Sequence, residues 1–321
     1  MPRVFLVDTD TASDDAVALL MALGSGDVRV AAITTVAGNV GVEQATRNAL
    51  YTVELCGSEV PIYPGASKPL SRAHQDATWF HGQDGLGDHG FRPQRRIAES
   101  RHAVDAIVDV IHANPGLTLV TLGPLTNIAL ALRRDFGIVA KIGRTVVMGG
   151  NPCCEGNVTP AAEFNIWVDP EAARIVLHSG LRVELTGWQL CRGNAVLGPA
   201  EIDAVWNWNT PLARFAIESN SRARQALMTQ TGEDGICLPD PVAMGIALDP
   251  SIATAWGDYY VDVETRSELT RGMTVVDRLN VASDARNRGT WSALIDHPPN
   301  ARVSWAIDVP RWKELLFSFL R

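Results

Sequence analysis

Four aspartates lie within eight residues near the start of the chain: Asp8, Asp10, Asp14 and Asp15. The apolar run from Val4 to Val7 enters this cluster and is typical of a buried strand, and the periodic apolar run from Ala16 to Leu23 leaves it and is typical of a helix. Carboxylates held together at one strand-to-helix turn repel one another. A bound divalent cation is the most economical way to offset that repulsion.

Every candidate ligand atom in this cluster is an oxygen, which indicates a hard cation such as Ca²⁺ or Mg²⁺. A simpler interpretation is that Ser13 or Asp14 caps the helix and that acids in its first turn complement the helix dipole. Capping explains two of the acids well and four of them poorly. We therefore interpret the cluster as a metal site first.

The chain of 321 residues carries 28 Lys and Arg against 36 Asp and Glu, which gives a formal net charge of −8. The basic residues are scattered, and this is not the charge pattern of a nucleic-acid-binding protein. No basic and apolar leader precedes the first strand pattern, and no apolar run approaches the about 18 residues of a membrane span. We therefore expect a cytoplasmic protein without nucleic-acid or membrane partners.

The sequence contains five cysteines: Cys56, Cys153, Cys154, Cys191 and Cys237. Their odd number and irregular spacing disfavour a disulfide framework, and no Cys/His spacing supports a zinc site. Reduced thiols that pack in the core or lie in loops are the expected state. The role of the adjacent pair Cys153 and Cys154 stays open.

Strand-like and helix-like stretches alternate over the first 190 residues, which predicts an α/β, Rossmann-like fold with a mostly parallel central sheet flanked by helices. The predicted strands are Val4–Val7, Val28–Thr35, Leu117–Leu122, Thr145–Met148 and Leu181–Leu185. The predicted helices are Asp15–Leu23, Gly41–Leu55, Ala103–Ala113, Leu125–Arg133 and Pro170–His178. Open sheets of this kind bind ligands at the carboxyl ends of their strands, where the aspartate cluster lies.

The second half of the chain is less regular. It is predicted to contain the helices Pro211–Ala226, Pro241–Leu248 and Pro310–Leu320 and the strands Tyr259–Thr265 and Ala301–Ile307. We expect a single domain over residues 1–321 with an irregular, mainly helical insertion around residues 190–240. The glycine-rich stretch His81–Gly90 predicts a surface loop near a site. Trp206 and Trp208 either mark a contact surface or pack locally.

Four further polar segments fall at predicted strand ends or helix starts. They are TTVAGNV with Asn39, LGPLTN from Leu122 to Asn127, MGGNPCCEGNVTPAAEFN from Met148 to Asn165, and LPDPVAM with Asp240. Each segment alone is explained as a helix cap or a turn. Together they converge on one edge of one sheet, and this favours a functional site.

With these segments in view, the sequence resembles the inosine-uridine-preferring nucleoside hydrolase family. DTDTASDD resembles the family's N-terminal DxDxxxDD motif. The segments ITTVAGNV, LGPLTNIA, VVMGG, EGN, AEFNIWVDPEAA, DPVA and RGMTVVD match in the same order. The resemblance runs from about residue 3 to the C-terminus.

The resemblance implies an enzyme that hydrolyses the N-glycosidic bond of ribonucleosides to ribose and free base with a tightly held Ca²⁺. It implies that Asp10, Asp15 and Asp240 are carboxylate ligands of the ion and that Leu122 contributes its backbone carbonyl. Asp10 would also be the general base, and Asp8 would support the turn behind the ligands. A homodimer or homotetramer is expected on the same ground.

Substrate recognition carries over from the same family. The residues matched to the ribose are Asp14, Asn39, Met148, Asn157, Glu163, Phe164, Asn165 and Asp240, and the residues matched to the base pocket are Trp79, His81 and Trp188. Residues 190–240 are expected to help form that pocket. Met148 and Phe164 could equally be core residues, and Trp79 and Trp188 could be ordinary packed aromatics.

The chain departs from the family where many members carry a histidine that protonates the departing base. That position is Pro239, which has no proton to donate. One answer is stacking of a purine on Trp79 or Trp188, and this makes a purine-leaning hydrolase our first interpretation. A second is another acid such as His81, with Glu233 and Asp234 as less supported candidates. A third is a weak enzyme, or one whose substrate has a better leaving group.

Two further hypotheses stay open. The enzyme could hydrolyse pyrimidine or modified ribonucleosides, because Pro239 and the poorly matching segment 217–236 leave the base preference undetermined. The protein could also bind nucleosides with Ca²⁺ without turning them over, a hypothesis that only Pro239 supports.

Overall fold

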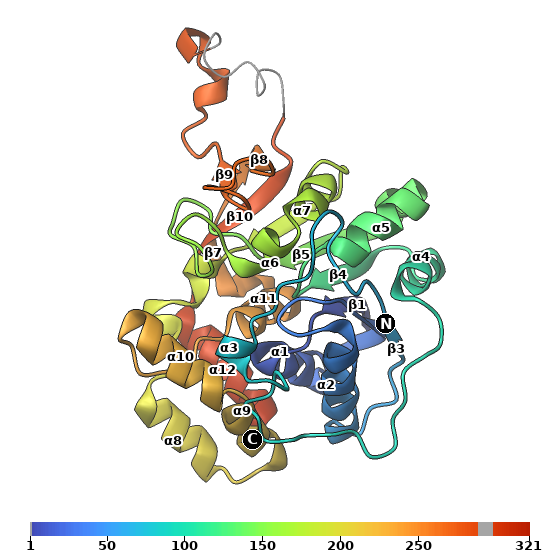
Figure 1. Ribbon diagram of the computed structural model, residues 1–321, viewed down its shortest axis with the longest axis vertical. Coiled ribbons are helices and arrows are strands. Elements are labelled where there is room, and N and C mark those ends of the chain that lie inside the picture. Colours follow the sequence, from blue (N-terminus) through green and yellow to red (C-terminus); the bar gives the residue numbers. More distant parts are fainter. Residues whose placement is uncertain (1, 288–297) are drawn as a thin grey trace.

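An eight-stranded sheet in the order β3-β2-β1-β4-β5-β6-β10-β7 runs through the centre of the protein (Figure 1). Neighbouring strands are parallel except β10 and β7, which pair antiparallel at one edge. The computed structural model describes residues 2–287 and 298–321. The strands are β1 (Arg3–Thr9), β2 (Val28–Thr35), β3 (Ile62–Pro64), β4 (Leu117–Thr121), β5 (Ile142–Met148), β6 (Val183–Thr186), β7 (Ala253–Tyr259), β8 (Val261–Val263), β9 (Thr274–Val276) and β10 (Ala301–Ile307). The predicted mostly parallel α/β fold is confirmed.

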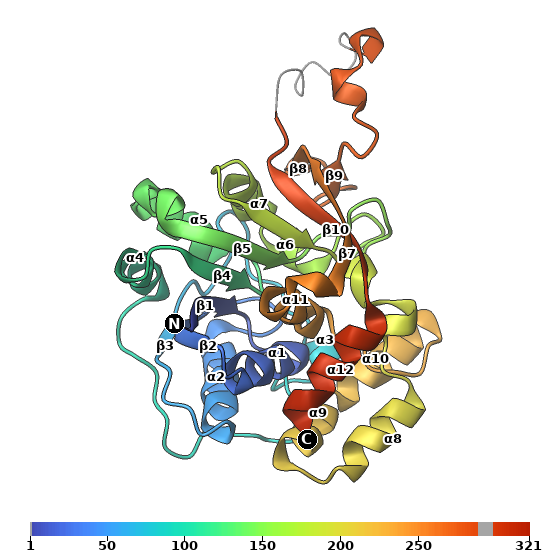
Figure 2. The ribbon, with the colours of Figure 1, turned by 180° about the vertical axis from the view of Figure 1, so that it is seen from behind.

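Helices cover both faces of the sheet (Figures 1 and 2). The helices are α1 (Ser13–Gly24), α2 (Val42–Leu55), α3 (Thr78–His81), α4 (Ala103–Ala113), α5 (Thr126–Arg134), α6 (Phe164–Val168), α7 (Pro170–Leu177), α8 (Pro199–Asn207), α9 (Pro211–Ser219), α10 (Ser221–Thr231), α11 (Pro239–Leu248) and α12 (Val309–Leu320). Helices α1, α2, α11 and α12 pack on one face, and α4, α5 and α7 pack on the other. In the described part of the chain, we find no helix with the length and apolar character to span a bilayer.

The side chains of β1 show how a strand in the middle of this sheet feeds two cores. Phe5 and Val7 point into the core beneath α1 and α11, whereas Leu6 points into the core beneath α4 and α5. Successive residues of a strand face opposite sides, and both sides are covered here. A continuous apolar run is therefore required at Val4–Val7.

The order of the strands reverses next to β1. After β1 the chain builds β2 and β3 on one side, and it then crosses to build β4, β5 and β6 on the other. Asp8, near the end of β1, lies level with Thr34 of β2 and Thr121 of β4. Ligands of open α/β sheets bind at such a switch point, outside the carboxyl ends of the strands. The first aspartates of the cluster occupy that place.

Two of the predicted elements were wrong in detail. The predicted helix Pro211–Ala226 is two helices, α9 and α10, which meet at Asn220. The Asn220 side chain donates hydrogen bonds to the carbonyls of Ser13 and Ala216, so a long-range contact fixes the break. The predicted strand Tyr259–Thr265 is the end of β7 followed by β8, which pairs with β9 in a separate small sheet. Trp206 and Trp208 pack locally against Arg214 and Phe317, respectively.

Candidate functional site

A pocket opens at the carboxyl edge of the sheet, over the switch point. Its lining comes from α1, the loop after β2, α3, the ends of β4 and β5, the 157–165 segment, Trp188, α10 and the start of α11. The lining residues are Asp14, Asn39, Ala77, Trp79, Phe80, His81, Leu122, Met148, Asn157, Val158, Glu163, Phe164, Asn165, Trp188, Gln230, Cys237, Pro239 and Asp240. All the residues predicted for ribose and base therefore share one pocket, whereas Asp8, Asp10 and Asp15 do not line it.

Asp15 lies in the first turn of α1 and is fully buried. One of its carboxylate oxygens accepts a hydrogen bond from the hydroxyl of Thr9 at 2.6 Å, and the other accepts from the backbone N–H of Ala12 at 2.9 Å. The carboxylate thus satisfies a free N–H at the helix start and ties α1 to the end of β1. Helix capping therefore explains the position of Asp15, but it does not explain the other aspartates of the cluster.

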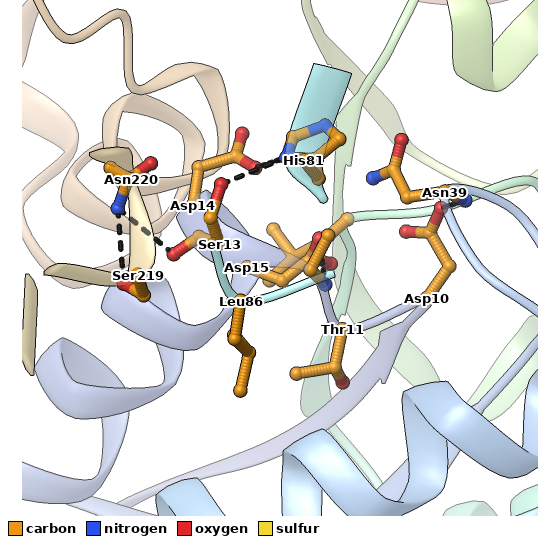
Figure 3. Close-up of polar contacts among 12 residues, drawn as sticks. Asp10, Thr11, Ser13, Asp14, Asp15, Asn39, His81, Leu86, Ser219 and Asn220 are labelled. Atoms are coloured by element: carbon orange, nitrogen blue, oxygen red, sulfur yellow. Dashed lines mark hydrogen bonds and ion pairs between the residues drawn. The ribbon is translucent and has the colours of Figure 1, made fainter. Parts of the chain in front are cut away.

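Asp10 is held between two glycines. Its Oδ2 accepts a hydrogen bond from the backbone N–H of Asn39 at 2.6 Å (Figure 3). A Cβ atom on Gly38 would lie 2.0 Å from Oδ2, and one on Gly123 would lie 2.5 Å from Oδ1. Only glycine leaves room for the carboxylate at these two positions. Sequence reasoning missed both glycines, although each lies in a segment that it singled out.

Asp8 lies deeper, behind the cluster. Its Oδ1 accepts hydrogen bonds from the hydroxyl of Thr34 at 2.5 Å and from the side-chain amide of Asn127 at 2.8 Å. The same Asn127 amide donates to the carbonyl of Thr35, and its oxygen accepts from the N–H of Ala66. Asn127 therefore joins the ends of β1 and β2 to the loop after β3. Its position in LGPLTN is explained by this bridge, and no pocket contact is needed.

Burial and mutual repulsion dominate the electrostatics of the cluster. Burial raises the pKa of Asp8 to about 7, and burial together with the charge of Asp15 raises the pKa of Asp14 to about 8. Burial and neighbouring carboxylates also raise the pKa values of Asp10 and Asp240, and burial raises the pKa of Asp15. Each raised value means that the negative form is unfavourable in this environment.

No basic side chain in the described ranges 2–287 and 298–321 compensates these charges: the pocket lining contains no Lys or Arg, and no ion pair joins one to the cluster. His81 lies 3.9 Å from Asp14, and its Nδ1 shares a hydrogen bond with the Ser13 hydroxyl at 2.8 Å (Figure 3). Burial lowers the pKa of His81 to about 3, so the ring is neutral near pH 7. The repulsion is left without a cationic partner from the protein.

The donor set fits a hard divalent cation. Carboxylate oxygens of Asp14, Asp15 and Asp240 lie within 4.8 Å of one another. Asp10 neighbours Asp15, and buried oxygens of Asp10 and Asp14 have no hydrogen-bond partner. An all-oxygen group of this kind suits Ca²⁺ or Mg²⁺. This triplet contains Asp14, a predicted ribose contact, in place of Asp10.

The wall beside the cluster is a connected polar network. The side-chain amide of Asn165 donates to the carbonyl of Leu122 at 2.7 Å and contacts the sulfur of Met148 at 3.2 Å. Glu163 accepts from the N–H groups of Asn165 and Gly150. Glu163 and Asn165, which carry the carboxylate and the amide of this network, both line the pocket. Such groups can recognise a polyhydroxylated ligand with directional hydrogen bonds.

The other side of the pocket is largely apolar. Trp79 from α3 is 60% exposed, whereas Trp188 is buried, and both line the pocket together with Pro239. Gln230 of α10 reaches across and donates to the carbonyl of Asn157 at 2.8 Å. Further lining residues that sequence reasoning missed are Ala77, Phe80, Val158, Gln230 and Cys237. Val158 lies in the singled-out segment from Met148 to Asn165, and Phe80 lies between the predicted residues Trp79 and His81. Gln230 and Cys237 lie in residues 190–240, which were expected to contribute.

The predicted loop His81–Gly90 borders the site and is held by its own acids. Asp84 accepts from the N–H groups of Leu86 and Asp88, and Asp88 accepts from the N–H of Gln83. Leu86 is fully buried next to α1. Glu233 and Asp234, the less supported candidate acids, do not line the pocket, and Asp234 instead pairs with Arg224.

Comparisons with known proteins agree with this geometry. The model of the family described as inosine-uridine preferring nucleoside hydrolase matches residues 5–314. The inosine-uridine preferring nucleoside hydrolase of Crithidia fasciculata is 37% identical over 284 residues, which cover 87% of this chain and 89% of that protein. A solved plant nucleoside hydrolase superposes with a TM-score of 0.91 at 29% identity, over 100% of this chain and 99% of that one. A purine-preferring ribonucleoside hydrolase from Gardnerella vaginalis gives 0.88 at 31% identity, with 99% and 98% covered.

The electrostatics predict how stability depends on pH and on metal. In the unfolded chain the pKa of these acids is near 3.8, whereas in the folded, metal-free protein it is about 7 for Asp8 and about 8 for Asp14. At any pH between these values the folded state therefore binds more protons than the unfolded state. The free energy of unfolding should therefore fall as pH rises from 5 to 8. Adding Ca²⁺ at 100 times its Kd should raise the free energy of unfolding by about 2.7 kcal/mol.

Chemical denaturation of chelator-treated protein at pH 5 and pH 8, with and without Ca²⁺, measures both effects. Asp15→Asn should weaken the response to Ca²⁺ strongly, whereas the surface control Asp27→Asn should keep it. A metal-free protein that becomes more stable from pH 5 to pH 8 would contradict the prediction, as would an absent response to Ca²⁺.

Proposed function

Because the chain belongs to the inosine-uridine preferring nucleoside hydrolase family and is a ribonucleoside hydrolase, we propose that it works with a bound Ca²⁺ and prefers purine ribonucleosides. The reaction breaks the N-glycosidic bond and releases ribose and free base. Family membership favours this reaction over nucleoside binding without turnover. The observation that carries the proposal is a buried, uncompensated carboxylate cluster beneath a pocket with one polar wall and one aromatic wall.

Asp10, Asp15, Asp240 and the carbonyl of Leu122 would hold the ion, with Asp14 close enough to contribute. When bound, Ca²⁺ would supply positive charge that orients ribose hydroxyls and makes a nearby water more acidic. Asp8 would hold the end of β1 in place through Thr34 and Asn127.

Asp10 is the proposed general base. Its Oδ1 is buried without a hydrogen-bond partner, and Asn39 and the two glycines fix its orientation. A base held this way can take a proton from the attacking water as the C–N bond breaks. Positive charge then develops on the ribose, as in other glycosidic cleavage, and the surrounding carboxylates stabilise it.

Ribose recognition is assigned to the polar wall. Asp14, Asn39, Asn157, Glu163 and Asn165 all reach the pocket, and Glu163 and Asn165 are oriented by backbone N–H groups and carbonyls. Met148 and Phe164 would pack against the sugar ring. A wall that satisfies its polar groups with hydroxyls disfavours a sugar that lacks one of them.

Departure of the base needs another source of activation, because Pro239 occupies the position of the missing acid. Trp79 and Trp188 offer aromatic surfaces on the apolar side, where a purine would stack. His81 is neutral and already engaged with Ser13, which makes it a poorer acid. The purine preference of the Gardnerella vaginalis relative supports the same choice. Cytoplasmic location and a homo-oligomer stay predictions.

The role of Asp10 predicts a large loss of turnover without loss of fold. Asp10→Ala should lower kcat by roughly 10²–10⁴-fold, because it removes general base catalysis. Hypoxanthine release from inosine measures the rate, and circular dichroism at increasing temperature checks the fold. A variant with wild-type kcat would show that Asp10 is not the base.

The ribose wall predicts strong discrimination against 2′-deoxynucleosides. Inosine should be hydrolysed roughly 10⁴-fold more efficiently than 2′-deoxyinosine, as kcat/KM, because buried polar groups would lose their partner. Comparable values for the two substrates would mean that the 2′-hydroxyl is not recognised.

Stacking on Trp79 predicts a base-dependent effect of its removal. An aromatic pair contributes about 0.5–1.5 kcal/mol, so Trp79→Ala should lower kcat/KM for inosine about two- to thirteenfold and change uridine less. Trp206→Ala is the matched control, because Trp206 is also exposed but packs on Arg214 away from the pocket. Equal losses for both substrates would argue against purine stacking.

A further inference from the structure

Two cysteines that the proposed mechanism does not use lie in contact beside the pocket. The Sγ atoms of Cys191 and Cys237 are 3.1 Å apart, although the two residues are 46 positions apart in sequence. Both are buried and both are free thiols. Sequence reasoning treated them as unrelated packing thiols, since neither spacing nor motif links them.

Backbone contacts hold the two segments together. Cys191 ends the short 3-10 helix Trp188–Cys191, and Cys237 comes two residues before α11 begins. Beyond the thiols, Leu197 and Ile236 exchange N–H to carbonyl hydrogen bonds of 2.9 and 3.0 Å. The Cys237 thiol donates to the Cys191 carbonyl at 3.2 Å. The fold therefore holds the backbones of the two cysteines next to each other.

The pocket gives one of the two thiols a route to small solutes. Cys237 lines the pocket together with Trp188 and Pro239, whereas Cys191 does not line it and is 1% exposed. Burial and the neighbouring thiol raise the pKa of Cys191 well above its usual value. A small oxidant that enters the pocket would therefore meet Cys237 first.

We propose that Cys191 and Cys237 form an oxidation site, at which a hydroperoxide converts the thiol pair to a disulfide and thereby inhibits hydrolysis. The Cys237 sulfur attacks the peroxide, the O–O bond breaks, and a sulfenic acid and an alcohol or water result. Cys191 then attacks that sulfur, the S–S bond forms, the S–O bond breaks, and the hydroxyl leaves as water with the Cys191 proton. The peroxide is reduced, and the two thiols are oxidised by two electrons.

The disulfide would disturb the site through the residues on either side of it. An S–S bond is about 2.05 Å long, so the two sulfurs must approach by about 1 Å. Trp188 lies three residues before Cys191, and Asp240 lies three residues after Cys237. A displacement of about 1 Å at such positions can cost about 10²-fold in rate. Reduction by a dithiol should reverse the loss.

The test uses the Ca²⁺-loaded wild-type protein and hydrogen peroxide as the oxidant. After treatment, free thiols are alkylated and the digested peptides are analysed by mass spectrometry without reduction. We expect a Cys191–Cys237 crosslink, at least a tenfold loss of inosine hydrolysis in proportion to the crosslink, and recovery of both after dithiothreitol. Saturating ribose should slow the crosslinking, because it would occupy the pocket.

Variants separate this pair from the other cysteines. Cys191→Ser should have near wild-type activity before treatment and form no crosslink, and brief peroxide treatment should leave its Cys237 as a sulfenic acid that dimedone traps. Cys191→Ala serves if the serine variant does not fold. Cys56→Ser is the matched control and should respond like wild type.

Three results would overturn the proposal. The first is oxidation of Cys237 without a crosslink to Cys191, and the second is a crosslink that leaves hydrolysis unchanged. The third is reversible inhibition in both Cys191 variants with no sulfenic acid trapped at Cys237, which would point to Cys153 and Cys154. Activity before treatment is measured separately, so failure of the hydrolase assignment is distinguishable from failure of this proposal.

Discussion

Repulsion among buried carboxylates is the constraint on which the rest of the site depends. Asp8, Asp10, Asp14, Asp15 and Asp240 converge at one end of the sheet, where burial raises the pKa of each of them. In the described part of the chain no Lys or Arg reaches them, and the nearby imidazole is neutral. Hydrogen bonds hold both oxygens of Asp15 and one oxygen each of Asp8 and Asp10, whereas Asp8 Oδ2, Asp10 Oδ1 and Asp14 Oδ1 are buried without a partner.

The fold supplies this arrangement through the reversal of strand order beside β1. Strands β2 and β3 lie on one side of β1, and β4 to β6 lie on the other. The carboxyl end of β1 therefore lies open between the loops after β2 and β4. Gly38 and Gly123 come from those two loops and enclose Asp10 from both sides. Asp240 arrives from the start of α11, and the indole N–H of Trp312 donates to the carbonyl of Pro241 in the first turn of that helix. Elements far apart in sequence thereby meet within a few ångströms.

The sequence was enough to predict the parallel sheet, because local signals carried it, whereas the residues of the polar wall were expected from the resemblance to the family. Apolar runs marked β1, β2 and β4, and the segments with Asn39, Leu122 and Asp240 each sat at a strand end or helix start. The break at Asn220, the clamp of Gly38 and Gly123 on Asp10 and the contact of Cys191 with Cys237 depend on partners tens to hundreds of residues away. Periodicity carries no information about such partners, so these features became visible only in three dimensions.

The most direct test of the central claim is a titration of Ca²⁺ into chelator-treated protein, with calorimetric binding and hypoxanthine release from inosine measured on the same samples. If the carboxylate cluster requires a cation for catalysis, the metal-free protein should release almost no base. One ion should then bind per chain, and the rate should rise in proportion to occupancy. Full hydrolysis by the metal-free protein, or hydrolysis that is unrelated to the bound Ca²⁺, would contradict the account.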